Sequence, residues 1–166
     1  METINVDKKT SYISLQIGSE QFAISVYKVL EIIQYAELTH VPNSSDYVPG
    51  VLNFRGSIVP VIDMHKRFYV NNGNSNSKMV VIVDAVSKEK NVLMGLLVDQ
   101  VTDVIEFDYK SIKSVPDLGI KYNPEFLEGF IEQNGKFVMV LNIDRVLNVD
   151  ELSDISKTAE IAAEQE

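Results

Sequence analysis

The sequence predicts an all-β protein made of two related halves, each a small barrel of about five strands. Short segments rich in Val, Ile and aromatic residues recur roughly every 8–12 residues and are separated by Gly, Pro, Asn and Asp, as is typical of a barrel or sandwich. The same apolar and glycine positions also occur twice along the chain. Helical periodicity, in contrast, is scarce before about residue 150.

The apolar runs mark ten candidate strands. In chain order these are Tyr12–Ile17, Gln21–Ile24, Val29–Ile33, Val51–Phe54, Ile58–Ile62, Val80–Val86, Val92–Val98, Val104–Phe107, Glu128–Glu132 and Phe137–Leu141. Single helical turns are expected at Met64–Phe68 and near Asn123–Leu127, and a C-terminal helix is expected from about Asp150. The polar run 71–77 has strong turn chemistry and predicts a loop between the halves.

The internal repeat defines a unit of about seventy residues. In its earlier block, Val26, Val29, Glu31 and Ile32 align with Val98, Val101, Asp103 and Val104, and Val41–Pro42 aligns with Val115–Pro116. In its later block, Gly50, Gly56, Val59 and Phe68 align with Gly129, Gly135, Val138 and Leu147. Each unit supplies about five strands, which suits a small barrel that closes its own edges.

The Asn53–Gly56 turn has both structural and functional interpretations. Gly56 and its twin Gly135 supply the positive φ of a tight hairpin turn, so both are expected to be structural. Asn53 and Arg55 have no counterpart in the second half, and the guanidinium of Arg55 suits a carboxylate such as that of Glu31. This pair is either an exposed ion pair worth about 0–1 kcal/mol or part of a surface that recognises a partner.

Composition disfavours several function classes. The formal net charge of −9, without a basic stripe, argues against nucleic-acid binding. The absence of cysteine excludes thiolate metal sites and disulfides within the chain. Residues 1–10 lack the apolar core of a signal peptide, and no later run approaches roughly 18 apolar residues. We therefore expect a cytoplasmic protein without direct membrane insertion.

Catalytic motifs are also missing from the sequence. The two histidines, His40 and His65, stand neither beside a nucleophile nor at metal-ligand spacing, and the glycines form no phosphate-binding loop. We expect no catalytic residue, no metal and no cofactor. The residues therefore indicate a β-rich interaction module rather than an enzyme.

Four segments resemble the CheW family of bacterial chemotaxis coupling proteins: Gly18–Ile24, Lys28–Ile32, Val48–Asp63 and Gly95–Val101. The resemblance covers about residues 10–150. It implies two intertwined SH3-like barrels, the first at about 18–70 and the second at about 79–148, and it says nothing of the tail at 150–166. One departure is Phe54, where the family usually has an aliphatic residue.

The resemblance implies an adaptor that couples methyl-accepting chemoreceptors to the histidine kinase CheA of a two-component system. The hairpin tip of the receptor would dock between the barrels, around Val29, Glu31, Arg55, Val80 and Val104. The CheW-like regulatory domain of the kinase would contact Lys113, Asp117 and Leu118. Other CheW-like domains in the rings of a receptor array are further candidate partners, and the protein would be recruited from the cytoplasm to membrane-associated arrays.

Two alternatives remain open from the sequence. A CheW-like adaptor could serve a kinase pathway other than chemotaxis, such as one for gliding, pili or a second messenger. A small-molecule-binding barrel or hydrolase would instead need a pocket of convergent polar groups. If the adaptor interpretation is right, Arg55→Ala should weaken receptor coupling while folding and kinase binding persist.

Overall fold

The computed structural model of the 166-residue chain describes residues 9–35, 37–70, 78–87, 89–114 and 124–146. The elements in chain order are β1 (Lys9–Ile17), β2 (Glu20–Ser25), η1 (Val26–Lys28), β3 (Val29–Gln34), β4 (Gly50–Phe54), β5 (Ser57–Asp63), α1 (Met64–Arg67), β6 (Met79–Ser87), β7 (Lys90–Val98), β8 (Gln100–Asp108), η2 (Tyr109–Ser111), η3 (Pro124–Phe126), β9 (Leu127–Gln133), β10 (Lys136–Leu141) and η4 (Ile143–Arg145), where η denotes a 3-10 turn. The all-β fold class is confirmed.

All ten expected strands are present, and so are the helical turns expected at Met64–Phe68 and near Asn123–Leu127. The sequence patterns missed the turns η1, η2 and η4, because three residues are too few to show a helical period. The expected loop at 71–77 and the expected helix from Asp150 lie outside the described residues. No helix in the described ranges has the length and apolarity needed to span a bilayer.

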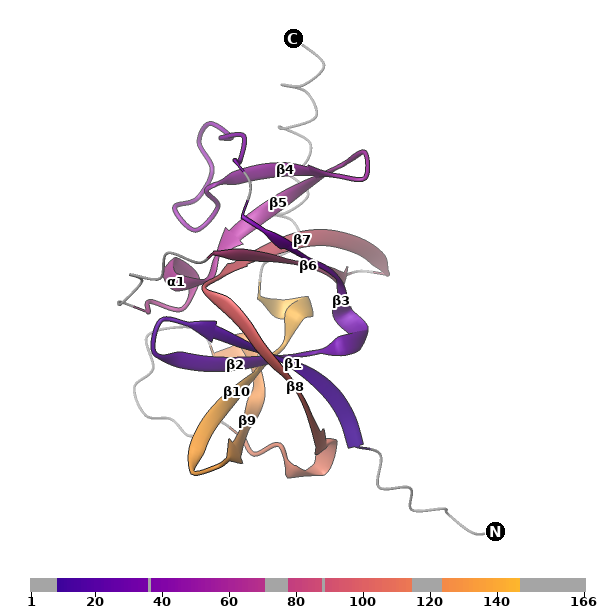
Figure 1. Ribbon diagram of the computed structural model, residues 1–166. Helices are drawn as coiled ribbons and strands as arrows, with labels where there is room; N and C mark the ends of the chain where they lie inside the picture. The colour runs from indigo at the N-terminus through magenta and orange to yellow at the C-terminus, as the bar shows by residue number, and fades with distance from the viewer. Residues whose placement is uncertain (1–8, 36, 71–77, 88, 115–123, 147–166) are drawn as a thin grey trace.

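The ten strands form two five-stranded sheets with matching strand orders, β8-β1-β2-β10-β9 and β3-β6-β7-β5-β4. Figure 1 shows the second sheet above the first. Each sheet takes one hairpin, β1-β2 or β6-β7, from one half of the chain and its other three strands from the other half. The barrels are therefore intertwined through exchange of the first hairpin of each half.

Strand register confirms the internal repeat. Val104 pairs with Ile13 across β8 and β1, as its twin Ile32 pairs with Val81 across β3 and β6. The β4-β5 and β9-β10 hairpins also share one register, with Asn53 opposite Ile58 and Glu132 opposite Phe137. These registers assign each residue of one barrel a twin in the other.

Backbone hydrogen bonds join the open side of each sheet at twin positions. The Thr39 N–H donates to Val51 O and the Val51 N–H to Thr39 O, both at 2.9 Å. Lys113 and Phe130 exchange the same two bonds at 2.9 Å. The segment after β3 thus bridges to β4, and the segment after β8 bridges to β9, so both sheets curl into barrels.

The composition of the sheets differs from the contiguous ranges expected for the two barrels. The range 18–70 includes β2, which belongs to the lower sheet, and the range 79–148 includes β6 and β7, which belong to the upper sheet. The reason is the exchange of hairpins, which no local pattern in the sequence encodes.

Apolar side chains of the described residues form four buried clusters, and three of them build the interior of the barrels and the contact between them. The largest joins both sheets and draws on β1 and β2 of the lower sheet, on β5, β6 and β7 of the upper sheet, and on α1, η3 and η4. Each barrel also has an interior cluster. Alternate residues of β6 face these different clusters, Val81 and Val83 the shared one and Val80 and Ile82 the upper interior, which explains why this strand is a continuous apolar run.

Candidate interaction surface

The turns of the twin hairpins β4-β5 and β9-β10 have nearly the same backbone. The two central residues of each turn have positive φ, 52° and 85° at Arg55 and Gly56, and 53° and 77° at Asn134 and Gly135. Positive φ at both positions is the signature of a type I′ turn, which matches the twist of the flanking strands. Gly56 and Gly135 are therefore structural, as the sequence predicted.

Arg55 is an unusual residue for its position. Asparagine tolerates the left-handed region, whereas a long side chain is strained there. Its guanidinium Nη2 lies 3.4 Å from Oε2 of Glu31 on β3, so the predicted ion pair is confirmed. The guanidinium carbon also lies 4.9 Å from the centroid of the Phe54 ring. The side chains remain accessible, with exposed fractions of 73% for Arg55 and 39% for Glu31.

Asn53 has a structural role that the sequence reasoning did not assign. Its Oδ1 accepts a hydrogen bond of 2.9 Å from the Gly56 N–H, which closes the turn. Asn53 therefore holds the loop that presents Arg55.

Two edge strands expose apolar side chains at twin positions. Ile32 on β3 is 36% exposed and Val104 on β8 is 66% exposed, and Tyr27 and Leu30 next to β3 or on it are exposed as well. Val29 is half-buried at the start of β3. The sequence reasoning did not single out Tyr27 and Leu30. Apolar residues on both faces of a strand at a sheet edge were the signal that could have found them.

Val80 does not belong to an accessible surface. Its side chain is fully buried in the interior of the upper barrel, next to Leu52, Val61 and Leu97. The expectation that Val80 contacts a receptor directly is therefore not supported by its position. The sequence could not reveal this, because a continuous apolar strand gives no indication of which face is open.

The second set of expected contact residues is only partly described. Lys113 is exposed and is anchored by its backbone bonds to Phe130. Asp117 and Leu118 lie outside the described residues.

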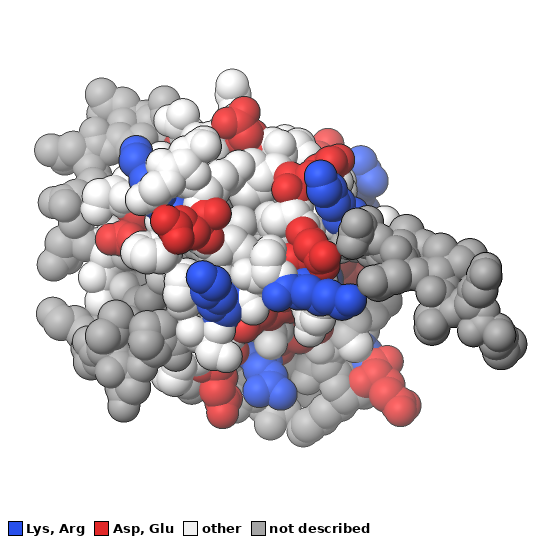
Figure 2. Space-filling model, turned by 90° about the horizontal axis from the view of Figure 1, so that it is seen from below, with Lys and Arg blue, Asp and Glu red and all other residues white. Residues whose placement is uncertain are grey.

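The histidines of the described residues lie apart from one another and from any metal-binding cluster. No group of three or more His, Cys, Asp or Glu side chains in the described ranges could hold a metal ion. His40 is exposed, and His65 Nε2 lies 2.6 Å from the Asp99 carboxylate, a contact that joins α1 to the residue between β7 and β8. On the face seen in Figure 2, acidic and basic side chains are interspersed. That face therefore has mixed charge rather than a field of one sign.

Comparison with known proteins places these features in context. The model of the CheW-like domain family matches residues 11–151. A chemotaxis protein CheW from Klebsiella aerogenes is 28% identical over 148 residues, which is 89% of this chain and 87% of that protein. A chemotaxis protein CheW from Rhizobium meliloti is 28% identical over 139 residues, 84% of this chain and 88% of that protein. The crystal structure of the scaffolding protein TtCheW from Thermoanaerobacter tengcongensis has a similar fold, with a TM-score of 0.78 and 23% identity, and the match covers 91% of this chain and 96% of that one.

Proposed function

Because this chain belongs to the CheW-like domain family, we propose that it couples the cytoplasmic hairpin tip of chemoreceptors to the CheW-like regulatory domain of a CheA-type histidine kinase. Its membership of the family makes it a non-enzymatic adaptor in chemotaxis signalling. The proposal adds the partners, the surfaces that they use and the place of action. The adaptor acts in the cytoplasm and is recruited to receptor arrays at the membrane.

The conformation of Arg55 carries this proposal. An L-residue in the left-handed region costs about 1–2 kcal/mol, and the twin turn meets the same geometry with Asn134, which adopts it more readily. The Glu31 pair is too exposed to offset this cost by much, since exposed pairs contribute about 0–1 kcal/mol. Local strain that the fold does not need is typical of a functional position. A permanently charged fork next to exposed apolar residues suits a protein partner that offers both a carboxylate and apolar side chains.

The receptor tip would lie against the edge strands. Glu31 and Arg55 would supply polar contacts, and Val29, Ile32 and Val104 would supply apolar area. Ile32 and Val104 are repeat twins, so the two edge strands present similar apolar positions. The kinase domain would bind the second barrel near Lys113. Other CheW-like domains could use the same kind of contact within array rings.

The mechanism that follows is scaffolding with allosteric transmission. An adaptor that contacts receptor and kinase together changes kinase activity only if its contacts differ between two receptor states. The shared apolar cluster makes the two barrels one packed unit, so a displacement at the edge strands reaches the second barrel through close-packed side chains. No chemical step on the adaptor is required.

The substitution Arg55→Asn tests the proposal. It removes the charged fork but gives the turn the residue of its twin, so the free energy of unfolding should stay the same or rise. We expect the affinity for receptor-containing membranes to fall about tenfold or more, because hydrogen bonds to charged groups are worth about 1.5–3 kcal/mol. Affinity for the isolated kinase domain should not change. Co-sedimentation and urea unfolding measure these quantities.

Two further variants complete the design. Lys136→Ala removes an exposed cation from the twin hairpin and should leave receptor and kinase binding unchanged. Lys113→Glu should weaken kinase binding and leave receptor binding intact. The proposal is wrong if Arg55→Asn binds receptor like the original chain, or if it loses receptor and kinase binding in equal proportion.

A further inference from the structure

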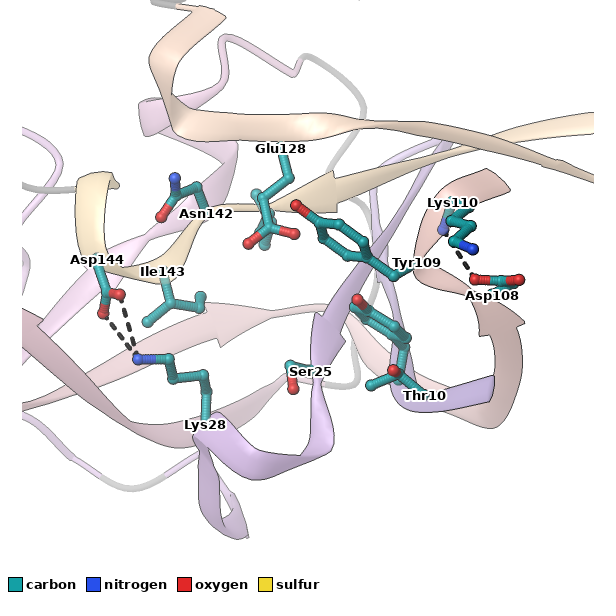
Figure 3. A pocket seen from close by; sticks show the side chains of 12 residues that line it. Thr10, Ser25, Lys28, Asp108, Tyr109, Lys110, Glu128, Asn142, Ile143 and Asp144 are labelled. Atoms are coloured by element: carbon teal, nitrogen blue, oxygen red, sulfur yellow. Dashed lines mark hydrogen bonds and ion pairs between the residues drawn. The ribbon is translucent and has the colours of Figure 1, made fainter. Parts of the chain in front are cut away.

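A pocket of about 520 Å³ opens at one end of the lower barrel. It is bordered by β1, β2, η1, η2, β9 and the segment from the end of β10 through η4 (Figure 3). The lining residues are Thr10, Tyr12, Ser25, Lys28, Asp108, Tyr109, Lys110, Glu128, Leu141, Asn142, Ile143 and Asp144. Its volume falls within the roughly 300–1,000 Å³ typical of small-ligand sites. We call it the Glu128 pocket.

The polarity of this pocket is not required by the barrel. The repeat register relates two of its polar residues to apolar residues of the upper barrel: Tyr12 and Ser25 correspond to Val80 and Leu97. Val80 and Leu97 belong to the packed interior of the upper barrel. Because the same architecture closes this place with apolar side chains, the polar groups of the lower barrel indicate a ligand.

The charges of the pocket are unevenly compensated. Both oxygens of Asp144 contact Lys28 Nζ, at 3.0 and 3.2 Å, and Asp144 Oδ1 also accepts the Val86 N–H at 2.8 Å. Asp108 accepts the backbone N–H of Lys110 at 2.9 Å. Glu128 has no hydrogen bond or ion pair to any residue in the described part of the chain. Its carboxylate, directed into the pocket in Figure 3, is therefore available to a ligand.

The electrostatics of the walls agree with this description. Although Glu128 lies at the mouth of the pocket, burial raises the pKa of its carboxyl, Asp144 raises this pKa further, and Lys28 partly lowers it. Burial, followed by the charge of Glu128 and by Tyr109, raises the pKa of the Tyr12 hydroxyl. Negative charge is therefore disfavoured in the pocket as it stands, and a cation beside Glu128 would relieve this.

Aromatic groups complete the environment. Tyr12 is buried and stacks on Phe107 with a distance of 4.1 Å between ring centroids, so its position is fixed. Tyr109 is 67% exposed and can cover a ligand. A carboxylate in a pocket that is also lined by aromatic rings is an environment that binds ammonium and guanidinium groups, through charge and cation–π attraction. Lys28 opposes such a ligand little, because Asp144 neutralises it.

We infer that the Glu128 pocket binds a basic group, an alkylammonium or alkylguanidinium, with the cation held between the Glu128 carboxylate and the rings of Tyr12 and Tyr109. This site is separate from the Arg55 surface, and the inference does not depend on the proposed function. The basic group can belong to a free small molecule or to a Lys or Arg side chain of a protein partner.

Titration of the isotope-labelled full chain with n-butylammonium, monitored by NMR, tests the inference. We expect shift changes confined to the pocket around Tyr12, Tyr109 and Glu128, and a downward displacement of the titration midpoint of the Glu128 carboxyl carbon when the pocket is occupied. Glu128→Gln should weaken binding about tenfold or more. Glu132→Gln, an exposed change on the same strand but outside the pocket, should have no effect.

Neutral and peptide probes sharpen the result. n-Butanol, which has the same alkyl chain without charge, should bind at least about tenfold more weakly. A capped Gly-Lys-Gly peptide that binds like n-butylammonium identifies a side chain as the source, whereas its exclusion identifies a free small molecule. Arg55→Asn should bind n-butylammonium normally. Equal binding of n-butanol, or retained binding in Glu128→Gln, would overturn the inference.

Discussion

Asp99 is a carboxylate buried where segments of both halves meet. Its Oδ2 accepts the Gly18 N–H from the β1-β2 turn at 2.7 Å, and its Oδ1 lies 2.6 Å from Nε2 of His65 in α1's first turn. The side chains are only 6% and 19% exposed. Because Nε2 faces a carboxylate, the ring carries its proton there. His65 thus supports a buried charge rather than any chemistry.

We predict that His65→Leu lowers the free energy of unfolding by about 1–3 kcal/mol at pH 7, because the buried Asp99 carboxylate then keeps only the hydrogen bond from the Gly18 N–H. Urea unfolding followed by circular dichroism measures this. Lys28→Met provides the control, since it breaks a more exposed ion pair with Asp144 and should cost only about 0–1 kcal/mol. Equal losses of unfolding free energy in the two variants would show that burial of the His65–Asp99 pair does not increase its contribution to stability.

A second prediction concerns the pH dependence of stability. The pKa of Glu128 in the folded protein is raised above its ordinary value of 4.5, so ionising this carboxyl costs stability. The cost is absent well below pH 4.5, grows as pH rises through the folded-state value, and is fully present above it. Glu128→Gln should therefore raise the free energy of unfolding at pH 7 and have no such effect at acid pH. Unfolding at several pH values, with Glu132→Gln as control, tests the sign.

The sequence predicted the contacts and burial of some individual residues and missed those of others, for physical reasons. The Glu31–Arg55 pair was predictable, because Arg55 has no counterpart in the second half and Glu31 offers its guanidinium a carboxylate. The buried position of Val80 was not, because both faces of β6 are covered. The Glu128 pocket was also out of reach, since its lining comes from segments separated by more than a hundred residues.

Among the elements, α1 links parts that are distant in sequence although it has only four residues. Asp63 caps it by accepting the backbone N–H groups of His65 and Lys66. The guanidinium of Arg67 lies 4.3 Å from the ring centroids of both Tyr47 and Phe126, and its Nε donates to Val146 O at 2.9 Å. One side chain therefore connects the loop before β4 with η3 and the residue after η4.

We predict that Arg67→Lys lowers the free energy of unfolding by about 1–2 kcal/mol although the charge is kept. The planar guanidinium of Arg67 contacts two aromatic rings and donates to Val146 O at the same time. A lysine ammonium is not planar and cannot replace both kinds of contact. Thermal unfolding measures the loss. Arg145→Lys, an exposed change in η4, should be nearly neutral. If both substitutions have the same small effect, stacking of Arg67 contributes little.

The existence of the strands was predictable, whereas their partners were not. Apolar patterning and the Gly turns indicated all ten strands, because burial and turn geometry are local constraints. Pairing between β1 and β8, or between β3 and β6, joins residues far apart along the chain, and the residues alone contain no signal for it. Only the family resemblance predicted that the barrels are intertwined.

At the scale of the whole molecule, two side-chain pairs, His65–Asp99 and Lys28–Asp144, fasten the exchanged hairpins at twin places. The Gly18 N–H after β1 donates to Asp99, and its twin, the Val86 N–H at the end of β6, donates to Asp144. Asp99 follows β7 and pairs with His65 after β5, whereas Asp144 follows β10 and pairs with Lys28 after β2. The acidic residue follows the exchanged hairpin in the first pair, whereas the basic residue follows the exchanged hairpin in the second. The hydrogen bond to the hairpin is thus the shared feature.

This exchange makes neither half self-sufficient. A fragment of residues 1–70 contains β3, β4 and β5 without strands β6 and β7 of their sheet, and its β1-β2 hairpin lacks all three other strands of the lower sheet. The largest apolar cluster would also lose its residues from β6, β7 and η4. A fragment of residues 78–166 is incomplete in the same way. Its lower sheet lacks β1 and β2, and its β6-β7 hairpin lacks β3, β4 and β5 of the upper sheet.

We therefore predict that neither fragment folds alone and that mixing them restores the native circular dichroism spectrum and one cooperative unfolding transition. The expected midpoint depends on concentration, because folding becomes an association once the chain is cut. His65→Leu in the first fragment should weaken reassembly far more than Lys28→Met, since its partner Asp99 lies in the second fragment and is the more deeply buried acid. Cooperative folding of either isolated fragment would mean that a barrel can close on the strands of one half, contrary to the pairing described above.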